Sequence, residues 1–281
     1  TVKEEIDKLL DVGFIFDVEN SEWVSPIVIS IKKNGNLRIC VDYRNLNKAT
    51  RKDHYPLPFS DQILDEVADH ECYSFVDGYS GYNQVRIVEK YQLKTMFTTP
   101  WGTFAYRVMS FGLCNAPATF QRLMNRVFKP YIGNLIKVFL DDFCIYGSKM
   151  DHLHQMETTF QRLDEAQASL NPTKCVFGCS KGILLGHVVS RDGIGTDPDK
   201  VSKIKDLPFP MNRRNKAHEA FGQLKEALVS SPILKNPDWS KPFIMYTDTS
   251  DAALGSTLSQ KDENGNEHLV YFGSRQMSSA E

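Results

Sequence analysis

The sequence predicts an α+β fold in which an antiparallel or mixed sheet is backed by helices on one face. Two observations support this prediction: short apolar strand-like segments alternate with helical ones, and many of the strands are joined as hairpins. A length of 281 residues allows two domains, or one large domain with an appendage. With 41% apolar and 24% charged residues, the composition is typical of a soluble globular protein.

The individual elements follow from local patterns. Residues 1–12 have the apolar periodicity of an amphipathic helix, and Asn34–Gly35 marks the turn of a hairpin that joins strands at 25–31 and 37–41. Pro117 suits the first turn of a helix. Later helices are expected at 60–68, 118–131 and 151–168, and later strands at 72–77, 94–99, 103–108, 175–177 and 183–189.

Two neighbouring aspartates, Asp141 and Asp142, stand between apolar runs in the segment Leu135–Tyr146. The flanking residues suit a buried pleated surface, so the segment is predicted as a hairpin with both aspartates at its tip. Asn-Gly or Asp-Gly would form an easier two-residue turn, which indicates another role for the aspartates. Side-by-side carboxylates repel each other unless a cation neutralises them, and Mg²⁺ prefers such oxygen ligands. A solvated loop is the alternative interpretation.

A third aspartate, Asp77, ends a short apolar strand far before Asp141 in the sequence. Neighbouring strands lie about 4.8 Å apart, so carboxylates at strand ends can share a pair of metal ions. Two metal ions about 3.5–4 Å apart stabilise the attacking and leaving oxygens of an in-line phosphoryl displacement, as nucleotidyl transfer requires. Asp42 also ends a strand, but Arg38 and Arg44 are near it in sequence, so we interpret Asp42 as part of a structural ion pair.

The local charge of the chain differs from its total. The net charge is −2, which by itself argues against a nucleic-acid partner. Residues 32–52, however, carry seven basic side chains and a single acid, Asp42. Such a patch supplies the sequence-independent attraction to phosphates that nucleic-acid or nucleotide binding needs. An exposed and solvated hairpin is the alternative.

The cysteines and the amino-terminal residues indicate the compartment. The six cysteines lie mostly within apolar segments, which suits a reducing compartment, and Cys175 and Cys179 lack a second Cys/His pair at zinc-binding spacing. The first ten residues are amphipathic, unlike a secretory signal, and have no starting methionine. No apolar run approaches the ~20 residues that span a bilayer. We therefore expect an intracellular piece of a longer chain, in a cytoplasmic particle or the nucleus and without a membrane partner.

Six ordered motifs over roughly residues 1–205 resemble the reverse transcriptase of Ty3/gypsy-type long-terminal-repeat retrotransposons. The motifs are Leu37–Lys48, Tyr55–Pro58, Phe75–Tyr82, Phe111–Gln121, Val138–Asp142 and Leu185–His187. The resemblance implies a right-handed polymerase with fingers and palm that uses dNTPs to extend a primer on an RNA or DNA template. In that family the aspartates matching Asp77, Asp141 and Asp142 hold two Mg²⁺ ions, for which Mn²⁺ can substitute.

The same resemblance implies nucleotide-binding roles. Lys33 and Arg38 match the fingers residues that clasp the incoming triphosphate. Tyr82 resembles the aromatic residue that lies against the deoxyribose and excludes a 2′-hydroxyl, whereas ordinary packing is its alternative role. Phe111 and Gly112 resemble the floor beneath the nucleotide and the template base.

Further matches concern the primer end. Leu185, Gly186 and His187 resemble the segment that grips the primer. Phe139 stands where the family usually has tyrosine before Leu-Asp-Asp, so a hydroxyl is lost near the primer end, and we expect altered efficiency rather than abolished chemistry. Lys174 either approaches the triphosphate or is an ordinary surface lysine.

The resemblance also gives domain boundaries: fingers and palm at 1–205, a shortened linker in place of the connection segment at 206–219, and a partial ribonuclease H-like α/β domain at 220–281. In the last of these, strands are expected at 243–248 and 252–258, and Asp248 matches the first metal-binding aspartate. A nuclease of this type needs three or four carboxylates around its two metals, and the chain stops at Glu281 before the others arrive. Asp248 is therefore expected to be a vestigial ligand.

The shortened linker and the partial domain have expected consequences. Without the thumb-like connection the polymerase should hold primer and template weakly, which predicts low processivity. The half-domain leaves a sheet edge unpaired, which predicts disorder, self-association, or contact with the rest of a polyprotein.

Two other interpretations are considered. A decayed copy of such an element would bind nucleic acid but polymerise poorly or not at all. A phospho-accepting signalling domain also binds Mg²⁺ through an acidic pair and a later aspartate. That class needs its acidic pair near the first strand, however, whereas Asp141 and Asp142 lie at mid-chain.

Overall fold

A computed structural model describes the chain at residues 1–31, 37–78, 81–208, 221–222, 225–226, 229, 233–250 and 253–277. The chain forms two compact units. The first comprises residues 1–58, 76–143 and 156–175, and the second comprises residues 59–75, 144–155 and 176–281. Within the described ranges, no helix combines the length and the apolar character needed to cross a membrane.

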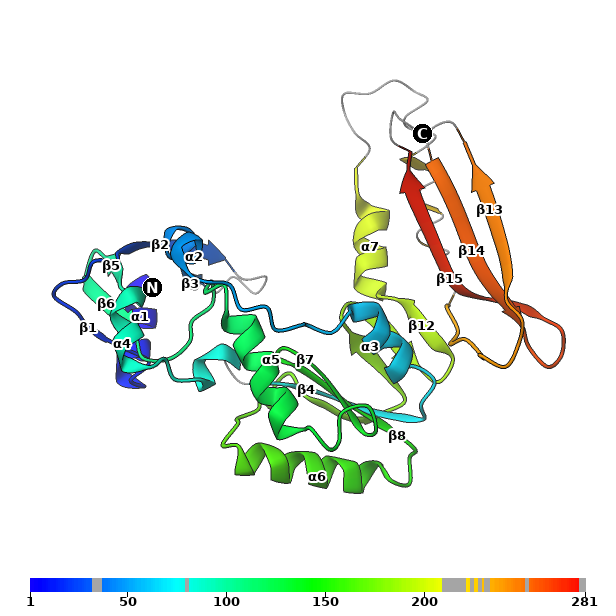
Figure 1. Ribbon diagram of the computed structural model, residues 1–281, viewed down its shortest axis with the longest axis horizontal. Helices are drawn as coiled ribbons and strands as arrows, with labels where there is room; N and C mark the ends of the chain where they lie inside the picture. The colour runs from blue at the N-terminus through cyan, green and yellow to red at the C-terminus, as the bar shows by residue number, and fades with distance from the viewer. Residues whose placement is uncertain are drawn as a thin grey trace. The chain divides into compact units, whose positions relative to one another are not determined.

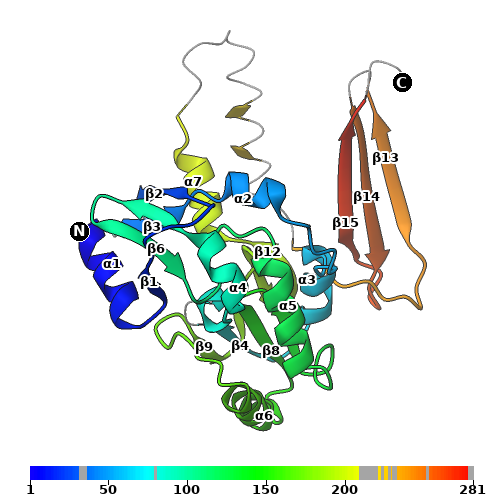
Figure 2. The same ribbon diagram turned by 60° about the vertical axis from the view of Figure 1, so that its left-hand side comes forward.

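The first unit contains a five-stranded sheet in the order β1-β6-β5-β2-β3, with helix α1 beside it in Figure 2. The strands pair antiparallel except β2 and β5, which pair parallel. The bounds of these elements are α1 Val2–Asp11, β1 Ile15–Asp17, β2 Ser25–Ile31, β3 Leu37–Val41, β5 Phe97–Thr99 and β6 Gly102–Tyr106. Shorter helices join them: α2 Arg44–Ala49, α4 Glu89–Gln92, and the 3₁₀ helices η1 Gly81–Gln84 and η2 Leu93–Thr95.

A hydrophobic cluster holds α1 against this sheet. Ile6 of α1 packs with Phe97 of β5 and Phe104 of β6, and all three side chains are almost fully buried. Burying a side chain of this kind contributes roughly 1.5–3 kcal/mol. Thr1 and Glu4 form a capping box at the start of α1, which satisfies backbone donors there. The amphipathic helix predicted at 1–12 is thus confirmed.

A second sheet, in the order β7-β8-β4-β9, carries the three aspartates singled out in the sequence. Its strands are β4 Cys72–Asp77, β7 Ile136–Phe139, β8 Asp142–Gly147 and β9 Val176–Cys179. The end of β4 and the beginning of β8 both belong to the first unit. Helix α5 (Ala116–Val127) lies along β7 in the same unit, as Figure 1 shows. Helix α6 (His152–Glu165) follows β8 along the chain.

Gln121 of α5 connects the helix to β7 and to the turn that follows it. Its side chain is buried, and its amide nitrogen donates to the carbonyl of Val138 at 3.0 Å. Its amide oxygen accepts from the backbone N–H of Leu140 at 2.8 Å. One side chain therefore satisfies two backbone groups beside Asp141, and so fixes the position of the turn relative to α5.

The second unit contains a three-stranded meander, β10-β11-β12, and helices before and after it. The bounds are α3 Ser60–Val67, β10 Lys181–Leu184, β11 His187–Ser190, β12 Gly193–Thr196 and α7 Pro198–Asp206. Ile194 of β12 forms a bridge with Leu234, in which each backbone N–H donates to the other carbonyl at 2.9 Å. Asp197 caps α7 by accepting from the backbone N–H of Asp199.

The carboxyl-terminal part of this unit forms an antiparallel sheet, β13-β14-β15, drawn in orange and red in Figure 1. Its strands are β13 Ile244–Thr249, β14 Ala253–Lys261 and β15 Glu267–Gln276. The first two confirm the strands predicted at 243–248 and 252–258, with shifts of one to three residues at their ends. β15 had no counterpart among the predicted elements. The expected consequences of an unpaired edge stay a prediction.

Some predicted boundaries are wrong because single residues turn the chain. The strand predicted at 94–99 begins only at Phe97, since Thr95 lies in η2, where its hydroxyl donates to the carbonyl of Gln92. The strand predicted at 183–189 is two strands, because Leu185 (φ 50°) and Gly186 (φ 74°) form the turn between them.

The helix predictions show similar differences. The helix predicted at 118–131 is α5, which starts two residues earlier with Pro117 in its first turn and ends at Val127. The helix predicted at 151–168 ends at Glu165, and Gln167 adopts a positive φ of 52° just beyond it. Helices α2, α4 and α7 were not predicted. The predicted Asn34–Gly35 turn and most of the predicted linker at 206–219 lie outside the described residues.

A buried serine–histidine pair anchors the second unit. Ser74 of β4 and His152 at the start of α6 are both buried, and Ser74 Oγ shares a 2.7 Å hydrogen bond with His152 Nε2. The same oxygen accepts from the backbone N–H of Gly178 at 3.0 Å. Burial lowers the pKa of His152 below its ordinary value of 6.5, because the charged imidazolium would lose its hydration.

The lowered pKa of His152 predicts that the protein loses stability in mild acid. Between the unfolded and folded pKa values the unfolded chain binds more protons, so the free energy of unfolding should fall as the pH drops below about 6.5. Urea denaturation at a series of pH values measures this. His152→Gln should remove this part of the pH dependence, whereas His54→Gln, at an exposed position, should retain it. Equal pH profiles for wild type and His152→Gln would contradict the prediction.

The role of Gln121 predicts a measurable loss of stability on substitution. Gln121→Leu preserves most of the volume but leaves the backbone N–H of Leu140 without its acceptor, so the free energy of unfolding should fall by about 1–3 kcal/mol. Urea denaturation is the measurement. Gln161→Leu, at an exposed position of α6, is the matched control and should change stability by less than about 0.5 kcal/mol. Similar losses in both variants would show that Gln121 has no special role.

Candidate carboxylate site

Backbone hydrogen bonds place Asp77 beside the turn that contains Asp141. Asp77 is the last residue of β4, and its carbonyl accepts from the backbone N–H of Asn171 at 2.9 Å. The next residue, Gly78, donates its backbone N–H to the carbonyl of Asp141 at 3.0 Å. The backbone after β4 is therefore bonded to this turn, while a metal site shared by the carboxylates stays a prediction.

The turn between β7 and β8 differs from the predicted one. Leu140 and Asp141 form it, and Asp142 is already the first residue of β8. The positive φ lies at Leu140 (55°), although leucine has no intrinsic preference for that region. The expectation that both aspartates occupy the tip was wrong. The backbone N–H of Leu140 donates to Gln121, which compensates for part of the unfavourable conformation.

Asp77 and Asp142 influence each other electrostatically. The pKa of Asp142 is raised first because neighbouring groups partly desolvate its carboxylate and second because Asp77 carries a like charge nearby. The ammonium of Lys174 acts in the opposite direction. Its Nζ lies 3.0 Å and 3.2 Å from the two carboxylate oxygens of Asp77. A cation is thus already drawn to this group of acids. The side chain of Lys174 is largely exposed, and its approach to a triphosphate stays a prediction.

Gly81 approaches the carboxylate of Asp141 closely. A β-carbon added to Gly81 would lie 2.8 Å from both Cγ and Oδ2 of Asp141, closer than real β-carbons come to other atoms. Its φ of 21° is also in the region that favours glycine. The start of η1 therefore forms a wall for Asp141 that only glycine can provide.

Tyr82 is buried next to the same aspartate. Its ring packs against Phe111 with centroids 5.0 Å apart and edge-on against Phe120 at 5.7 Å. Burial and then the charge of Asp141 raise the pKa of Tyr82 to about 12. Phe120 packs against one side of the Tyr82 ring, as expected from ordinary packing, the alternative role proposed from the sequence. The partly exposed Phe111 covers another side of the ring.

Asparagine side chains shape the loop that carries Gly112. Asn47 of α2 donates to the carbonyl of Gly112 at 2.7 Å and accepts from the backbone N–H of Cys114 at 2.9 Å. Gly112 has a φ of 95°, and an added β-carbon would meet the carbonyl oxygen of Val41 at 3.3 Å. Sequence reasoning missed Asn47. Asn47 lies within the motif Leu37–Lys48, but its partner Gly112 is 65 residues away in the sequence. No local pattern indicates such a contact.

The rival aspartate is engaged elsewhere. Asp42 forms a two-pronged ion pair with Arg44, whose Nη2 lies 2.6 Å from Oδ2. Hydrogen bonds from Arg44 hold the pKa of Asp42 below its usual value. The predicted structural ion pair of Asp42 is thus confirmed, and Arg44 is its partner.

Other predicted residues are placed separately. Phe139 is the last residue of β7, in the first unit. Leu185 and Gly186 form the β10–β11 turn of the second unit, where Lys200 donates to the carbonyl of Gly186 at 2.9 Å, and His187 opens β11.

Three further residues complete the predicted set. Asp248 is an exposed residue of β13 that pairs with Gly255. Lys33 lies outside the described residues, and Arg38 is described only through its backbone pairing with Ser30 in the β2–β3 hairpin.

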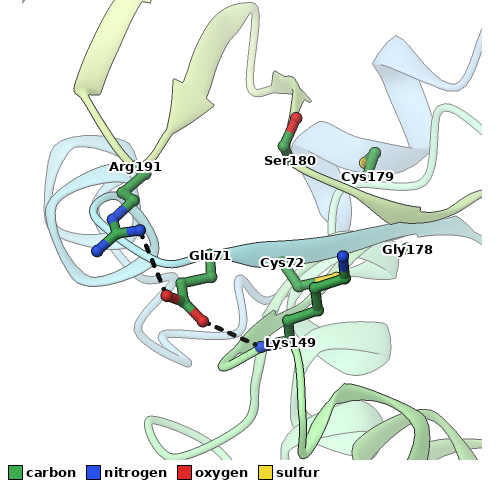
Figure 3. Close-up of a pocket in the computed structure, with 7 residues that line it drawn as sticks. All are labelled: Glu71, Cys72, Lys149, Gly178, Cys179, Ser180 and Arg191. Atoms are coloured by element: carbon green, nitrogen blue, oxygen red, sulfur yellow. Dashed lines mark hydrogen bonds and ion pairs between the residues drawn. The ribbon is translucent and has the colours of Figure 1, made fainter.

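A cavity of about 480 Å³ lies in the second unit, and Figure 3 shows the residues that line it: Glu71, Cys72, Lys149, Gly178, Cys179, Ser180 and Arg191. Glu71 Oε1 lies 3.3 Å from Nη1 of Arg191, and the backbone N–H of Lys149 donates to Glu71 at 3.4 Å. Cys179, like Cys175, is a free thiol. None of the residues predicted for catalysis lines this cavity.

The donor chemistry of the carboxylate site fits a hard divalent cation. Asp77, Asp141 and Asp142 offer only carboxylate oxygens, which Mg²⁺ prefers. Across the described residues, however, no three His, Cys, Asp or Glu side chains converge closely enough to form a metal-binding group. Lys174 holds both oxygens of Asp77, so the ammonium and a metal ion would compete for the same ligand.

Comparison with known families gives a consistent match. Residues 31–207 match the family model described as "Reverse transcriptase (RNA-dependent DNA polymerase)". Residues 214–281 match the model described as "RNase H-like domain found in reverse transcriptase". The resemblance inferred from the six motifs is thus confirmed.

Curated relatives are polyproteins of transposons. The chain is 32% identical over 326 aligned residues to the "Retrovirus-related Pol polyprotein from transposon 297" of Drosophila melanogaster, and 27% identical over 320 to the "Transposon Tf2-3 polyprotein" of Schizosaccharomyces pombe. All of this chain is matched, but it spans only 30% and 24% of those relatives. The first match covers 326 positions against 281 residues here, so it includes positions that this chain lacks.

Solved structures share the fold. Two structures of the foamy viral protease-reverse transcriptase, one in complex with an RNA/DNA hybrid and one with double-stranded DNA, each match with a TM-score of 0.86. Sequence identity is 19%, and 99% of this chain is covered against 43% and 56% of those chains. The match confirms the predicted fold class.

The contact between Gly81 and Asp141 generates a stability prediction. Gly81→Ala should lower the free energy of unfolding by about 1–3 kcal/mol, because either the carboxylate or the start of η1 must move to admit the methyl group. Gly265→Ala is the control: its φ of 82° is also positive, but no atom lies within 4 Å of the added carbon. Urea denaturation should show a smaller loss in the control, of about 1 kcal/mol. Equal losses would mean that the backbone conformation, not the contact with Asp141, is responsible.

Proposed function

Because the chain belongs to the reverse transcriptase family, we propose that it is the polymerase part of a retrotransposon polyprotein and transfers deoxynucleotides to the 3′ end of a primer. The observation that carries the proposal is the placement of Asp77 at the end of β4 beside Asp141 and Asp142, with a charge interaction between Asp77 and Asp142. A site of crowded carboxylates has little structural value unless cations are bound there.

In this proposal Asp77, Asp141 and Asp142 hold two Mg²⁺ ions, with Mn²⁺ as a substitute. Bound there, the ions would stabilise the charge that develops on the attacking and leaving oxygens during phosphoryl displacement. The chain's own contribution is to fix the three carboxylates. Gln121 does so through the backbone of the turn, and Gly81 does so through its close approach to Asp141.

The aromatic residues beside Asp141 would position the incoming nucleotide. Tyr82 is held by Phe120, and it would lie against the deoxyribose and exclude a 2′-hydroxyl. Phe111 and Gly112 would form the floor of the site, because Asn47 holds their loop in a fixed conformation.

Cationic side chains would hold the triphosphate. Lys33 and Arg38 would clasp it. Lys174 would turn from Asp77 to the phosphates once metal ions neutralise the aspartates, since the attraction that now holds its ammonium would then be weaker.

The remaining predicted contacts concern the primer and the adjoining domain. Leu185, Gly186 and His187 would grip the primer, and Phe139 would lie near its end. Asp248 lies in the part of the chain that matches the ribonuclease H-like domain and would be a metal ligand of that domain. A shortened linker at 206–219 would give low processivity. The partners would be a primed RNA or DNA template, dNTPs and the rest of the polyprotein, or a second copy, in a cytoplasmic particle or the nucleus.

A second candidate is a decayed copy that binds nucleic acid with little or no catalysis. Two observations favour it. Lys174 occupies both oxygens of Asp77, and the match to the transposon 297 polyprotein includes positions that this chain lacks. The two candidates make different predictions for nucleotide incorporation, whereas they make the same prediction for binding.

A primer-extension assay tests the proposal. With a primed RNA template, dNTPs and Mg²⁺, the chain should add nucleotides to the primer. Asp141→Asn should reduce incorporation by about 100-fold or more, because several kcal/mol of transition-state stabilisation are lost and each 1.36 kcal/mol is a factor of ten.

The control is Asp164→Asn, at an exposed position of α6, which should retain wild-type incorporation. Fluorescence anisotropy with the labelled primer–template provides a separate readout. Binding without incorporation by the wild type would favour the decayed copy, and incorporation that survives Asp141→Asn would refute the proposed site.

A further inference from the structure

A cavity of about 560 Å³ lies in the first unit, separate from the carboxylate site. Its walls come from α2, from the segment after η1, from η2 and from the start of α5. None of Asp77, Asp141, Asp142 and Lys174 lines it. Its volume is within the range of about 300–1,000 Å³ that is typical of small-molecule sites.

The inner wall of this cavity is apolar. Leu46 of α2 and Met109 are buried, and Leu113 is half-buried against the same core. Trp23 adds a half-buried aromatic surface at another side. Such a wall offers a ring system a dry surface, which favours the transfer of planar apolar groups out of water.

The rim of the cavity is cationic. Arg51, Arg86 and Lys94 line it, and its lining contains no aspartate or glutamate. Among the described residues none of these three cations forms an ion pair, and Lys94 only stands over the ring of Tyr91 at 5.3 Å. Three cations without an acid attract an anion, and the low-dielectric wall behind them strengthens that attraction.

The neutral polar groups of the wall are already used within the protein. Asn47 bonds the loop at Gly112 and Cys114, while Asn115 donates to the carbonyl of Arg51 at 2.9 Å. The cavity is therefore preformed, and its amides add little to recognition. Selection of a ligand therefore depends on the cations of the rim and on the apolar wall, rather than on these amides.

We propose that this cavity binds a small aromatic anion: one planar ring system carrying a phosphate, sulfonate or carboxylate group. The ring would lie against Leu46, Met109 and Trp23, and the anionic group would face Arg86 and Lys94. This site does not depend on the proposed polymerase activity, because it shares no carboxylate with it and requires no metal ion.

Isothermal titration calorimetry with naphthalene-2-sulfonate tests the proposal on the full chain in buffer containing EDTA, so that no metal ion contributes. One molecule should bind per chain. Neutral 2-naphthol, which has the same rings, should bind about tenfold more weakly because it lacks the charge. Arg86→Gln should weaken binding of the sulfonate by a similar factor without changing that of 2-naphthol.

Two further variants separate this cavity from other apolar surfaces. Ala49→Phe, at an exposed lining position near the end of α2, should fill the cavity and abolish binding of both probes. Arg126→Gln, at an exposed arginine of α5 outside the lining, is the matched control and should bind as the wild type does. Thermal melts should show that each variant folds.

Three results would overturn the proposal. They are no saturable binding of naphthalene-2-sulfonate, binding that Arg86→Gln and Ala49→Phe leave unchanged, and equal affinity for the charged and neutral probes. If Ala49→Phe fails to fold, Arg86→Gln together with 2-naphthol still decides the question, because an exposed arginine can be replaced without disturbing the core.

Discussion

Repulsion between crowded carboxylates is the constraint around which this region of the protein is built. Asp77 ends one strand, and Asp142 begins another, so their charges raise the energy of the folded chain unless a cation lies nearby. Lys174 supplies part of that compensation. Its side chain is largely exposed, so solvent screens the attraction and the pair contributes little to stability. The site therefore depends on its scaffold more than on its internal charges.

The scaffold consists of uncharged contacts that keep the acids from moving apart. Gln121 of α5 holds the turn at Leu140, and the backbone N–H of Gly78, just after β4, holds it at Asp141. Gly81 limits the space available to the carboxylate of Asp141. Each of these contacts is short and buried or close to backbone, where hydrogen bonds are hard to replace by water. These contacts therefore fix the turn and the strand ends that carry the three acids.

Sequence alone located the acids but not the contacts that hold them. Asp77 and Asp141 follow apolar strand-like runs. This pattern is local, so it can be recognised without knowing which strands pair with each other. Gln121 could not be recognised, because a glutamine in an amphipathic helix is expected to face solvent. Its buried position depends on the packing of β7 against α5, which the local sequence does not reveal. The turn was placed one residue late, because leucine at a positive φ contradicts local preference and tertiary contacts decide it. The β10–β11 turn was missed for a similar reason, at Leu185.

The two adjacent aspartates are not equivalent. Asp141 lies in the turn, where Gly81 touches its carboxylate and its charge acts on the buried Tyr82. Asp142 opens β8 and responds instead to Asp77 and Lys174. Gly81 therefore confines the carboxylate of Asp141 on one side. Lys174 acts on Asp77 through hydrogen bonds and on Asp142 through its charge, so a substitution of this lysine would disturb these two acids together.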